Sequence, residues 1–357
     1  MREIKRVLNR DIGTINRITL EVLGKDNIIS IYLYGGYGRD EGSWVLNESD
    51  KETLVRPYND YDIALIVKNK VSVEQLRLLE NELKRNINIK WIDICQYTIL
   101  NLKMFNATIK NIDFKYASKW IYGDETVLEH IPTMHAKSIS LKDVEVLYIT
   151  RLWTLVGSFP KNGLAEMAED EEMFFRNQMA KAILAIVDNI LIINKQYDTS
   201  YKVRVEKLAS YSNDHELIDL SKWALEEKLF PKSVGMDSKE VNDLYATVNK
   251  LFFKYFYSTL SKYYRSTIKA PEDVDKYIIF NPLDFVKRKI KKYVFNDHRR
   301  ELNMYLSILQ GYIAFYYFDM SAECFKKIRS IMERKFSFQS DDIDQIRLKV
   351  AQLRADL

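Results

Sequence analysis

The stretch Ile28-Ile-Ser-Ile-Tyr-Leu-Tyr-Gly-Gly-Tyr-Gly-Arg-Asp-Glu-Gly42 decides the fold of the N-terminal part of this chain. Its first seven residues are an apolar run rich in β-branched and aromatic residues, which predicts a buried strand ending at Tyr34. The chain has only 11 glycines in 357 residues. Four of them fall within eight residues of this stretch, namely Gly35, Gly36, Gly38 and Gly42. Because glycine adopts backbone conformations closed to other residues, this concentration predicts a sharp turn that a ligand can approach closely.

The segments on either side of this turn alternate between helical and strand patterns. Apolar residues recur at helical spacing over residues 4–23 and 71–85. Residues 61–67 and 89–99 are short apolar runs that predict two further strands. This order predicts a small mixed α/β domain that ends near residue 138.

Beyond residue 141 the pattern is helical throughout, so we expect an α+β fold with a small mixed-sheet domain followed by a larger all-helical domain. The predicted helices span residues 141–157, 165–196, 203–210, 214–228, 238–266, 282–294, 298–319, 321–335 and 340–355. We expect three domains. They are an α/β domain over 1–138, a helical bundle over 139–270 and a C-terminal helical extension over 271–357.

Three acidic residues occupy the predicted strands. Asp60 and Asp62 are two apart, a spacing that places both carboxylates on one face of a strand. Asp93 lies between two isoleucines in an apolar run, where a lone carboxylate is costly unless it is paired or metal-bound. If the two strands are neighbours, the three carboxylates converge at one sheet edge. Hard oxygen ligands suit Mg²⁺, and this arrangement is the one that two-metal phosphoryl transfer needs.

Each feature also has a simpler interpretation when it is taken alone. A Gly-Gly pair after a strand is common in hairpins, an Asp-x-Asp pair is mostly a solvated strand end, and Asp93 could be a salt-bridged acid. All three features in this order, each tied to a predicted strand, favour the metal site.

The order strand-Gly-Gly-x-Gly-Arg, Asp-x-Asp and a later strand Asp resembles the DNA polymerase β-type nucleotidyltransferase superfamily. The resemblance covers residues 25–130 and is greatest to the bacterial branch of aminoglycoside and minimal nucleotidyltransferases. It implies that residues 1–138 are the catalytic domain and that 139–270 bind the nucleotide and the acceptor. It also implies that Gly35, Gly36 and Gly38 bind the triphosphate of an NTP such as ATP. Asp60, Asp62 and Asp93 would hold two Mg²⁺ ions, with Mn²⁺ as an alternative, and Asp93 would act as or beside the base. The stretch Trp120-Ile-Tyr-Gly-Asp124 resembles a turn that often follows the third acid in this branch.

The chain departs from the family pattern in two places. Gly36 stands where the family commonly has serine, and 23 residues separate Gly36 from Asp60, about twice the usual number. The extra segment, 41–58, is either a long hairpin over the site or a surface insertion. Arg39 either contacts the triphosphate or pairs with Asp40 or Glu41.

The helical half offers further candidates for ligand contacts. Lys181 resembles the phosphate-binding lysine of related enzymes, while the alternative is a lysine whose stem covers the core. Ser200 and Tyr201 could contact a phosphate and a base, although capping of the next helix by Thr199 or Ser200 is favoured. The basic stretch 287–292 is either a solvated helix face or a surface for RNA or an acidic partner.

Composition sets the remaining limits. The chain is 47% apolar, which excludes a disordered protein. Its formal charge of +4 is too small to imply nucleic-acid binding by itself. Only Cys95 and Cys324 occur, so we expect no disulfide scaffold and a cytoplasmic location. No apolar run of about 18 residues occurs, so we expect no membrane span.

These observations together predict a magnesium-dependent nucleotidyltransferase. It would transfer NMP from an NTP to a hydroxyl of a small-molecule acceptor and release pyrophosphate. The open alternatives are protein nucleotidylation, RNA or cyclic-oligonucleotide synthesis, and a catalytically silent nucleotide-binding module.

Overall fold

The computed structural model describes residues 2–48, 53–158, 167–279 and 299–355. These residues form two compact units. The sheet unit comprises Met1–Ser140, Asn194–Ser210 and Leu225–Lys232, and the helical unit comprises Leu141–Ile193, Tyr211–Ala224 and Ser233–Leu357. The chain thus has the expected α+β fold, with a small mixed sheet followed by a large helical region. The division into three domains at residues 138 and 270 remains a prediction.

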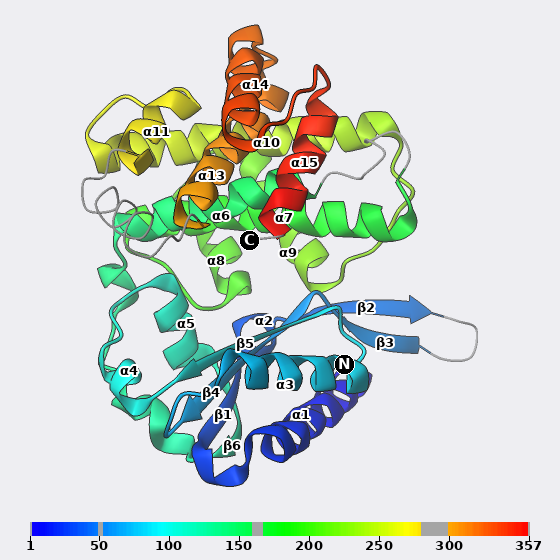
Figure 1. Ribbon diagram of the computed structural model, residues 1–357, viewed down its shortest axis with the longest axis vertical. Helices are drawn as coiled ribbons and strands as arrows, with labels where there is room; N and C mark the ends of the chain where they lie inside the picture. The colour runs from blue at the N-terminus through cyan, green and yellow to red at the C-terminus, as the bar shows by residue number, and fades with distance from the viewer. Residues whose placement is uncertain (1, 49–52, 159–166, 280–298, 356–357) are drawn as a thin grey trace. The chain divides into compact units, whose positions relative to one another are not determined.

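The sheet unit is built on four strands in the order β5-β4-β1-β6 (Figure 1). The strands are β1 (Ile28–Tyr34), β4 (Asp60–Val67), β5 (Trp91–Tyr97) and β6 (Lys119–Gly123). Strand β4 pairs with β5 in parallel and with β1 antiparallel, and β1 pairs antiparallel with β6. The sheet is therefore mixed, and the two acid-bearing strands are direct neighbours.

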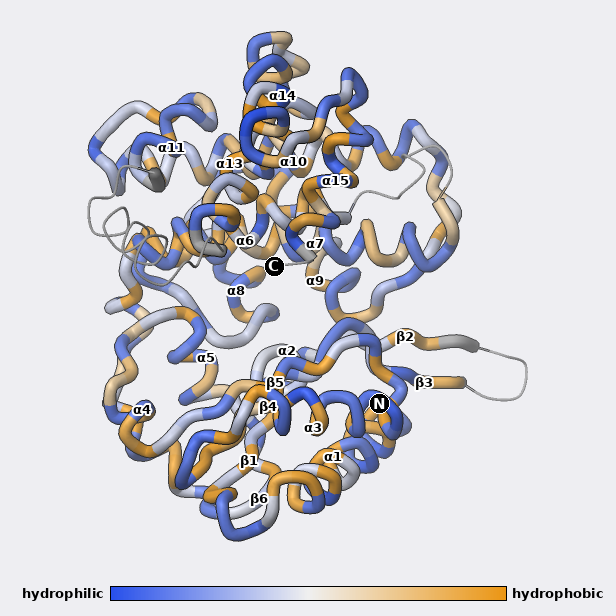
Figure 2. The backbone as a smooth tube through the Cα atoms, viewed as in Figure 1, coloured by the Kyte–Doolittle hydropathy of each residue, from blue (hydrophilic) through white to orange (hydrophobic). Residues whose placement is uncertain are grey.

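Helices α1 (Arg2–Leu23) and α3 (Val73–Asn86) cover one face of this sheet and lie side by side in Figure 1. Their apolar stripes pack on alternate residues of the two central strands, among them Leu33, Tyr61 and Ile63. Strands β1 and β4 carry long hydrophobic stretches in Figure 2 because both of their faces are covered. Helix α3 begins at a capping box that Ser72 forms with Gln75.

The opposite face of the sheet packs against α5 (Ile109–Ala117), and the short helix α4 (Ile99–Lys103) follows β5. The Phe114 ring of α5 meets the Tyr34 ring edge to face, with the ring centroids 5.6 Å apart. Three short 3-10 turns, Lys25–Asn27, Glu125–His130 and Ala136–Ser138, complete this part of the unit. Gly123 at the end of β6 has φ +85°, and a Cβ there would lie 2.0 Å from the Ile29 carbonyl oxygen, so this position requires glycine.

The additional segment 41–58 contains an antiparallel hairpin of β2 (Ser43–Glu48) and β3 (Thr53–Tyr58). Trp44 is buried, and its ring packs edge to face on Tyr37. The hairpin interpretation is therefore confirmed, whereas its position over the site stays a prediction. Two later segments join the sheet unit, namely α8 (Tyr201–Leu208) and the last part of α9 (His215–Leu229).

The helical unit packs long helices around a common core. Most residues of α7 are buried in this core. Helices α6 and α10 pack on α7, which is largely apolar around its circumference, and α13 packs on α6 and α10. The helices are α6 (Leu141–Gly157), α7 (Glu169–Ile193), α10 (Ser238–Tyr264), α11 (Pro271–Ile279), α13 (Arg299–Asp319), α14 (Ala322–Phe336) and α15 (Ile343–Ala355). All of them except α11 match predicted helices within a few residues, and α11 was not predicted. The predicted helix 282–294 lies outside the described residues. Among the described helices, none has the length and apolarity needed to cross a membrane.

Candidate functional site

The three predicted acids lie together at one edge of the sheet. Strands β4 and β5 pair with Asp62 opposite Asp93, and Asp60 lies two residues earlier on the same face of β4. One carboxylate oxygen from each of the three residues lies within 4.8 Å of the others. Tyr61 and Ile63 face α1, so the acids lie on the opposite face of the sheet. The donor set is three hard oxygen ligands at the spacing a divalent cation can bridge, and it therefore fits Mg²⁺ or Mn²⁺.

The negative charge of Asp60 opposes the ionisation of Asp93. Asp93 is exposed, yet partial desolvation, followed by the negative charge of Asp60, raises its pKa above the ordinary aspartate value. Lys84 and Lys110 lower that pKa, but their effect is smaller. The Asn59 amide donates to Asp60 from a left-handed backbone conformation with φ 78°. Asparagine adopts this conformation more readily than most residues, so it suits the turn into β4.

The glycine turn directly follows β1 and abuts the acids. Tyr34 pairs with Asp62 across the sheet, so Gly35 at the start of α2 (Gly35–Gly38) lies beside the Asp62 carboxylate. Gly35 has φ +65°, and a Cβ there would lie 2.1 Å from Asp62 Oδ2. Within the described residues, no side chain caps the start of α2. Backbone alone can therefore occupy the space next to Asp62.

The other two predicted turn glycines also have close backbone neighbours. A Cβ at Gly36 would lie 3.2 Å from the Glu41 carbonyl oxygen, and one at Gly38 would lie 2.6 Å from the Leu33 carbonyl oxygen. The tight packing at Gly38 gives this glycine a structural reason to be present. The contact of Gly35, Gly36 and Gly38 with a triphosphate remains a prediction.

The Arg39 side chain is only 9% exposed and is held by two carboxylates. Its guanidinium donates to Asp113 Oδ2 at 2.7 Å and pairs with Glu41 Oε2 at 3.3 Å. Asp40 pairs instead with Lys119. The structure thus contains the expected pairing of Arg39 with Glu41. The contact of Arg39 with a triphosphate stays a prediction.

The first residues of helix α8 contact the side chain of Glu41. The Glu41 carboxylate accepts hydrogen bonds from Ser200 Oγ at 2.7 Å and from the Tyr201 amide at 2.8 Å. Ser200 is the N-cap of α8, since its hydroxyl accepts from the Val203 amide at 3.3 Å, which confirms the predicted capping role. The Tyr201 ring faces the guanidinium groups of Arg39 and Arg204, at 4.4 and 4.1 Å from its centroid.

Lys228 is a site candidate that sequence reasoning missed. It is buried in the last turn of α9, and its ammonium donates to Ser43 Oγ at 2.8 Å and to the Glu41 carbonyl at 3.4 Å. The ammonium lies 3.4 Å from the position a Cβ would take at Gly36. Its only sequence signal is a lysine at the end of a predicted helix, because its contacts join segments separated by 185 residues.

Two predicted candidates lie outside the described part of the sheet unit. Lys181 is a half-buried residue of α7 in the helical unit, and its contact with a phosphate remains a prediction. The basic stretch 287–292 lies outside the described residues.

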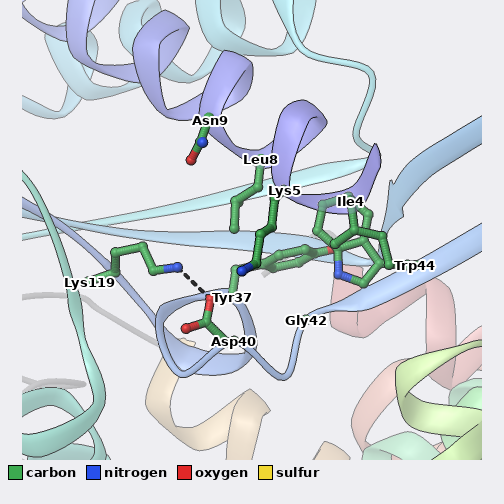
Figure 3. Close-up of a pocket in the computed structure, with 9 residues that line it drawn as sticks. All are labelled: Ile4, Lys5, Leu8, Asn9, Tyr37, Asp40, Gly42, Trp44 and Lys119. Carbon is green, nitrogen blue, oxygen red and sulfur yellow. Dashed lines mark hydrogen bonds and ion pairs between the residues drawn. The ribbon is translucent and has the colours of Figure 1, made fainter. Parts of the chain in front are cut away.

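A cavity of about 450 Å³ borders the glycine-turn segment on the α1 side of the sheet unit (Figure 3). Helix α1 lines it with two apolar and two polar residues, namely Ile4, Leu8, Lys5 and Asn9. Tyr37 and Trp44 form an aromatic wall, and the Lys119–Asp40 ion pair spans one side. None of the predicted site residues lines it. The cavity and the three acids are therefore separate features on opposite faces of the sheet.

The chain was compared with protein families, curated proteins and solved structures. No protein-family model matches this chain, and no curated protein sequence matches it. Among solved structures, the chain is similar to spectinomycin adenyltransferase AAD(9) from Enterococcus faecialis, crystallised with ATP and spectinomycin. The two are 14% identical over 69% of this chain and 98% of that chain, with a TM-score of 0.44.

Proposed function

We propose that this protein is a magnesium-dependent nucleotidyltransferase. The observation that carries the proposal is the convergence of Asp60, Asp62 and Asp93 within 4.8 Å, directly beside a glycine whose position excludes any side chain. Acids held this close repel one another, and a fold gains nothing from that repulsion unless a cation or substrate uses it.

The three carboxylates would hold the metal. Bound there, Mg²⁺ supplies activation of an acceptor hydroxyl and neutralisation of the charge on the transferring phosphate. Asp60 and Asp62 come from one strand and Asp93 from its parallel neighbour, so hydrogen bonding in the sheet holds the ligand set in place before substrate arrives. This preorganisation is what a phosphoryl-transfer site requires.

The residues around the acids have defined roles in this proposal. Gly35 lets the backbone of the turn lie directly against Asp62, where its N–H groups would face the phosphates of an NTP, and the Lys228 ammonium near Gly36 offers a positive charge to them. The acceptor oxygen attacks the α-phosphorus and forms a new P–O bond. The bond from the α-phosphorus to the bridging oxygen breaks, pyrophosphate leaves, and the hydroxyl proton passes to Asp93 or to water beside it.

We propose a small molecule with a free hydroxyl as the acceptor and ATP as the first nucleotide to test. The mild net charge of +4 favours such an acceptor over a polynucleotide. Protein nucleotidylation, RNA or cyclic-oligonucleotide synthesis and a silent nucleotide-binding module are the alternatives that turnover distinguishes.

The test is pyrophosphate release from ATP and Mg²⁺ in the presence of a panel of hydroxylated small molecules, including aminocyclitols and sugars. We expect acceptor-dependent release by the wild type and none by Asp93→Asn. The matched control is Asp26→Asn, since Asp26 is an exposed aspartate at the opposite end of β1 from the glycine turn. Full activity in Asp93→Asn would overturn the mechanism. Nucleotide binding without turnover on any acceptor class would favour the silent module.

A further inference from the structure

The loop that follows the glycine turn is tied to a helix that comes about 160 residues later in the sequence. Glu41 makes the connection, since its carboxylate accepts from Ser200 Oγ, the Tyr201 amide and the Lys202 amide, at 2.7, 2.8 and 3.2 Å. The first amide groups of a helix have no partner within the helix, and a carboxylate there also meets the positive end of the helix dipole. Glu41 therefore anchors the start of α8 at the glycine-turn segment.

The backbone of Glu41 holds the glycine turn itself. Its amide donates to the Gly36 carbonyl at 2.8 Å, and its own carbonyl accepts from the Lys228 ammonium at 3.4 Å. One residue thus contacts the second turn glycine through its main chain and α8 through its side chain. A shift of Glu41 relative to α8 would move the turn.

An ion pair between Arg39 and Glu41 strengthens this connection. Arg39 bridges Glu41 and Asp113, and Asp113 also accepts from the Tyr197 hydroxyl at 2.9 Å. The side chains of Arg39, Glu41 and Asp113 are only 9%, 12% and 14% exposed. The Arg39–Asp113 hydrogen bond is charge-assisted and has little contact with solvent, and Glu41 adds an ion pair to the same guanidinium, so this network resists displacement of the loop.

We infer that Glu41 is a positioning residue, which through α8 and Arg39 fixes the glycine turn beside Asp62 and thereby sets the affinity for the nucleotide triphosphate. The inference rests on the proposed function, because it names the device that holds the turn for that ligand. Glu41 does not touch the three acids, so divalent-metal binding by the acids alone is independent of it.

The matched pair of variants is Glu41→Gln and Asp198→Asn. Glu41→Gln removes the charge that Arg39 and the α8 amides share but keeps nearly the same shape. Asp198 also supports the start of α8, where it accepts from the Ser200 amide at 3.1 Å and pairs with Lys207 at 3.0 Å. Asp198→Asn therefore removes a negative charge at the start of α8, with its ion pair to Lys207, without touching the glycine-turn loop.

The experiment measures three quantities on the full chain. They are ATP binding with Mg²⁺ by calorimetry, Mn²⁺ binding by the acids without nucleotide, and amide hydrogen exchange of residues 35–43. We expect Glu41→Gln to weaken ATP binding by ~10-fold or more, to speed exchange over 35–43, and to leave Mn²⁺ binding unchanged. Asp198→Asn should leave all three close to wild type.

Equal ATP affinity in Glu41→Gln and the wild type would overturn the inference while leaving the proposed function intact. Failure of the wild type to bind any NTP would instead remove the proposed function. The exchange of residues 35–43 would then decide alone whether Glu41 positions the turn, with unchanged exchange counting against it. If Glu41→Gln does not fold, the same comparison is made on Glu41→Asp, which keeps the charge and shortens the side chain by one methylene.

Discussion

At the scale of single residues, the acid cluster lowers the stability of the fold when no metal is bound. Asp93 lies next to Asp60 and Asp62, and the combined effect of desolvation and like charge raises its pKa. A carboxyl whose pKa is higher in the folded state than in the unfolded state destabilises the fold whenever it is ionised. Asp93 is exposed, so solvent keeps this effect small.

We therefore expect Asp93→Asn to raise the free energy of unfolding without metal by up to ~1 kcal/mol at neutral pH. The sign follows from the raised pKa. The cost of the native carboxylate is full above its folded pKa and disappears as pH falls below the unfolded value, so the gain in the variant fades near pH 4. Urea unfolding of both proteins at pH 7 and pH 4 measures this difference in the free energy of unfolding. A variant that is less stable than wild type at pH 7 would contradict it.

Gly35 is a second residue that an experiment can test. The test separates its backbone strain from its contact with Asp62. Alanine there would need a left-handed backbone and would bring its Cβ to 2.1 Å from Asp62 Oδ2. Gly24 has φ +76° with nothing within 4 Å of a Cβ, so it isolates the backbone strain. We expect Gly24→Ala to cost roughly 1–2 kcal/mol of stability, and Gly35→Ala to cost more and also to weaken Mn²⁺ binding.

Thermal melts and Mn²⁺ titrations compare the two glycine variants. Equal stability losses with Mn²⁺ binding intact in both would show that Gly35 serves the turn alone and not the acid site.

At the scale of elements, what could be predicted from the sequence depends on the length of each pattern. The strands β1 and β4 and the long helices carry enough apolar periodicity to be placed within a few residues. The short helices α4 and α5 were not predicted because so few turns give no clear period. Their local signals are the capping residues Thr98 and Thr108. The hydroxyls of these residues accept from the backbone N–H groups of Asn101 and Asn111.

The site shows the same division between local and distant signals. The acids and the glycine turn are local patterns, and the structure brings them together as the alternation of strand residues requires. Lys228 and the attachment of α8 to Glu41 depend on contacts between segments 160–185 residues apart. No local pattern of residues encodes such pairings.

Helix α7 offers a test of how its core is built. Asn189 is fully buried, and neither its amide nitrogen nor its amide oxygen has a hydrogen-bond partner among the described residues. An unpaired buried amide costs about 1–3 kcal/mol, so we expect Asn189→Leu to stabilise the protein by about 1 kcal/mol or more. The exposed Asn242→Leu is the control, with a change within about 0.5 kcal/mol. A destabilised Asn189→Leu would indicate that this amide binds an internal water.

At the scale of the whole molecule, the sheet unit is not one continuous stretch of chain. It gathers Met1–Ser140, Asn194–Ser210 and Leu225–Lys232 around one sheet. The alternation of helical and strand patterns predicted the first of these segments, but the two later ones had only helical patterns and read as parts of a bundle. The function we propose depends on this gathering, because Glu41, α8 and Lys228 meet beside the turn.

The central claim is that Asp60, Asp62 and Asp93 bind a metal together with a nucleotide triphosphate, and calorimetry of ATP binding with and without Mg²⁺ tests it most directly. The measurement compares the wild type with the double variant Asp60→Asn/Asp62→Asn and needs no knowledge of the acceptor. The account predicts binding that requires Mg²⁺ in the wild type and is lost in the double variant, with its melting temperature preserved. Magnesium-dependent ATP binding of equal strength in both proteins would contradict it.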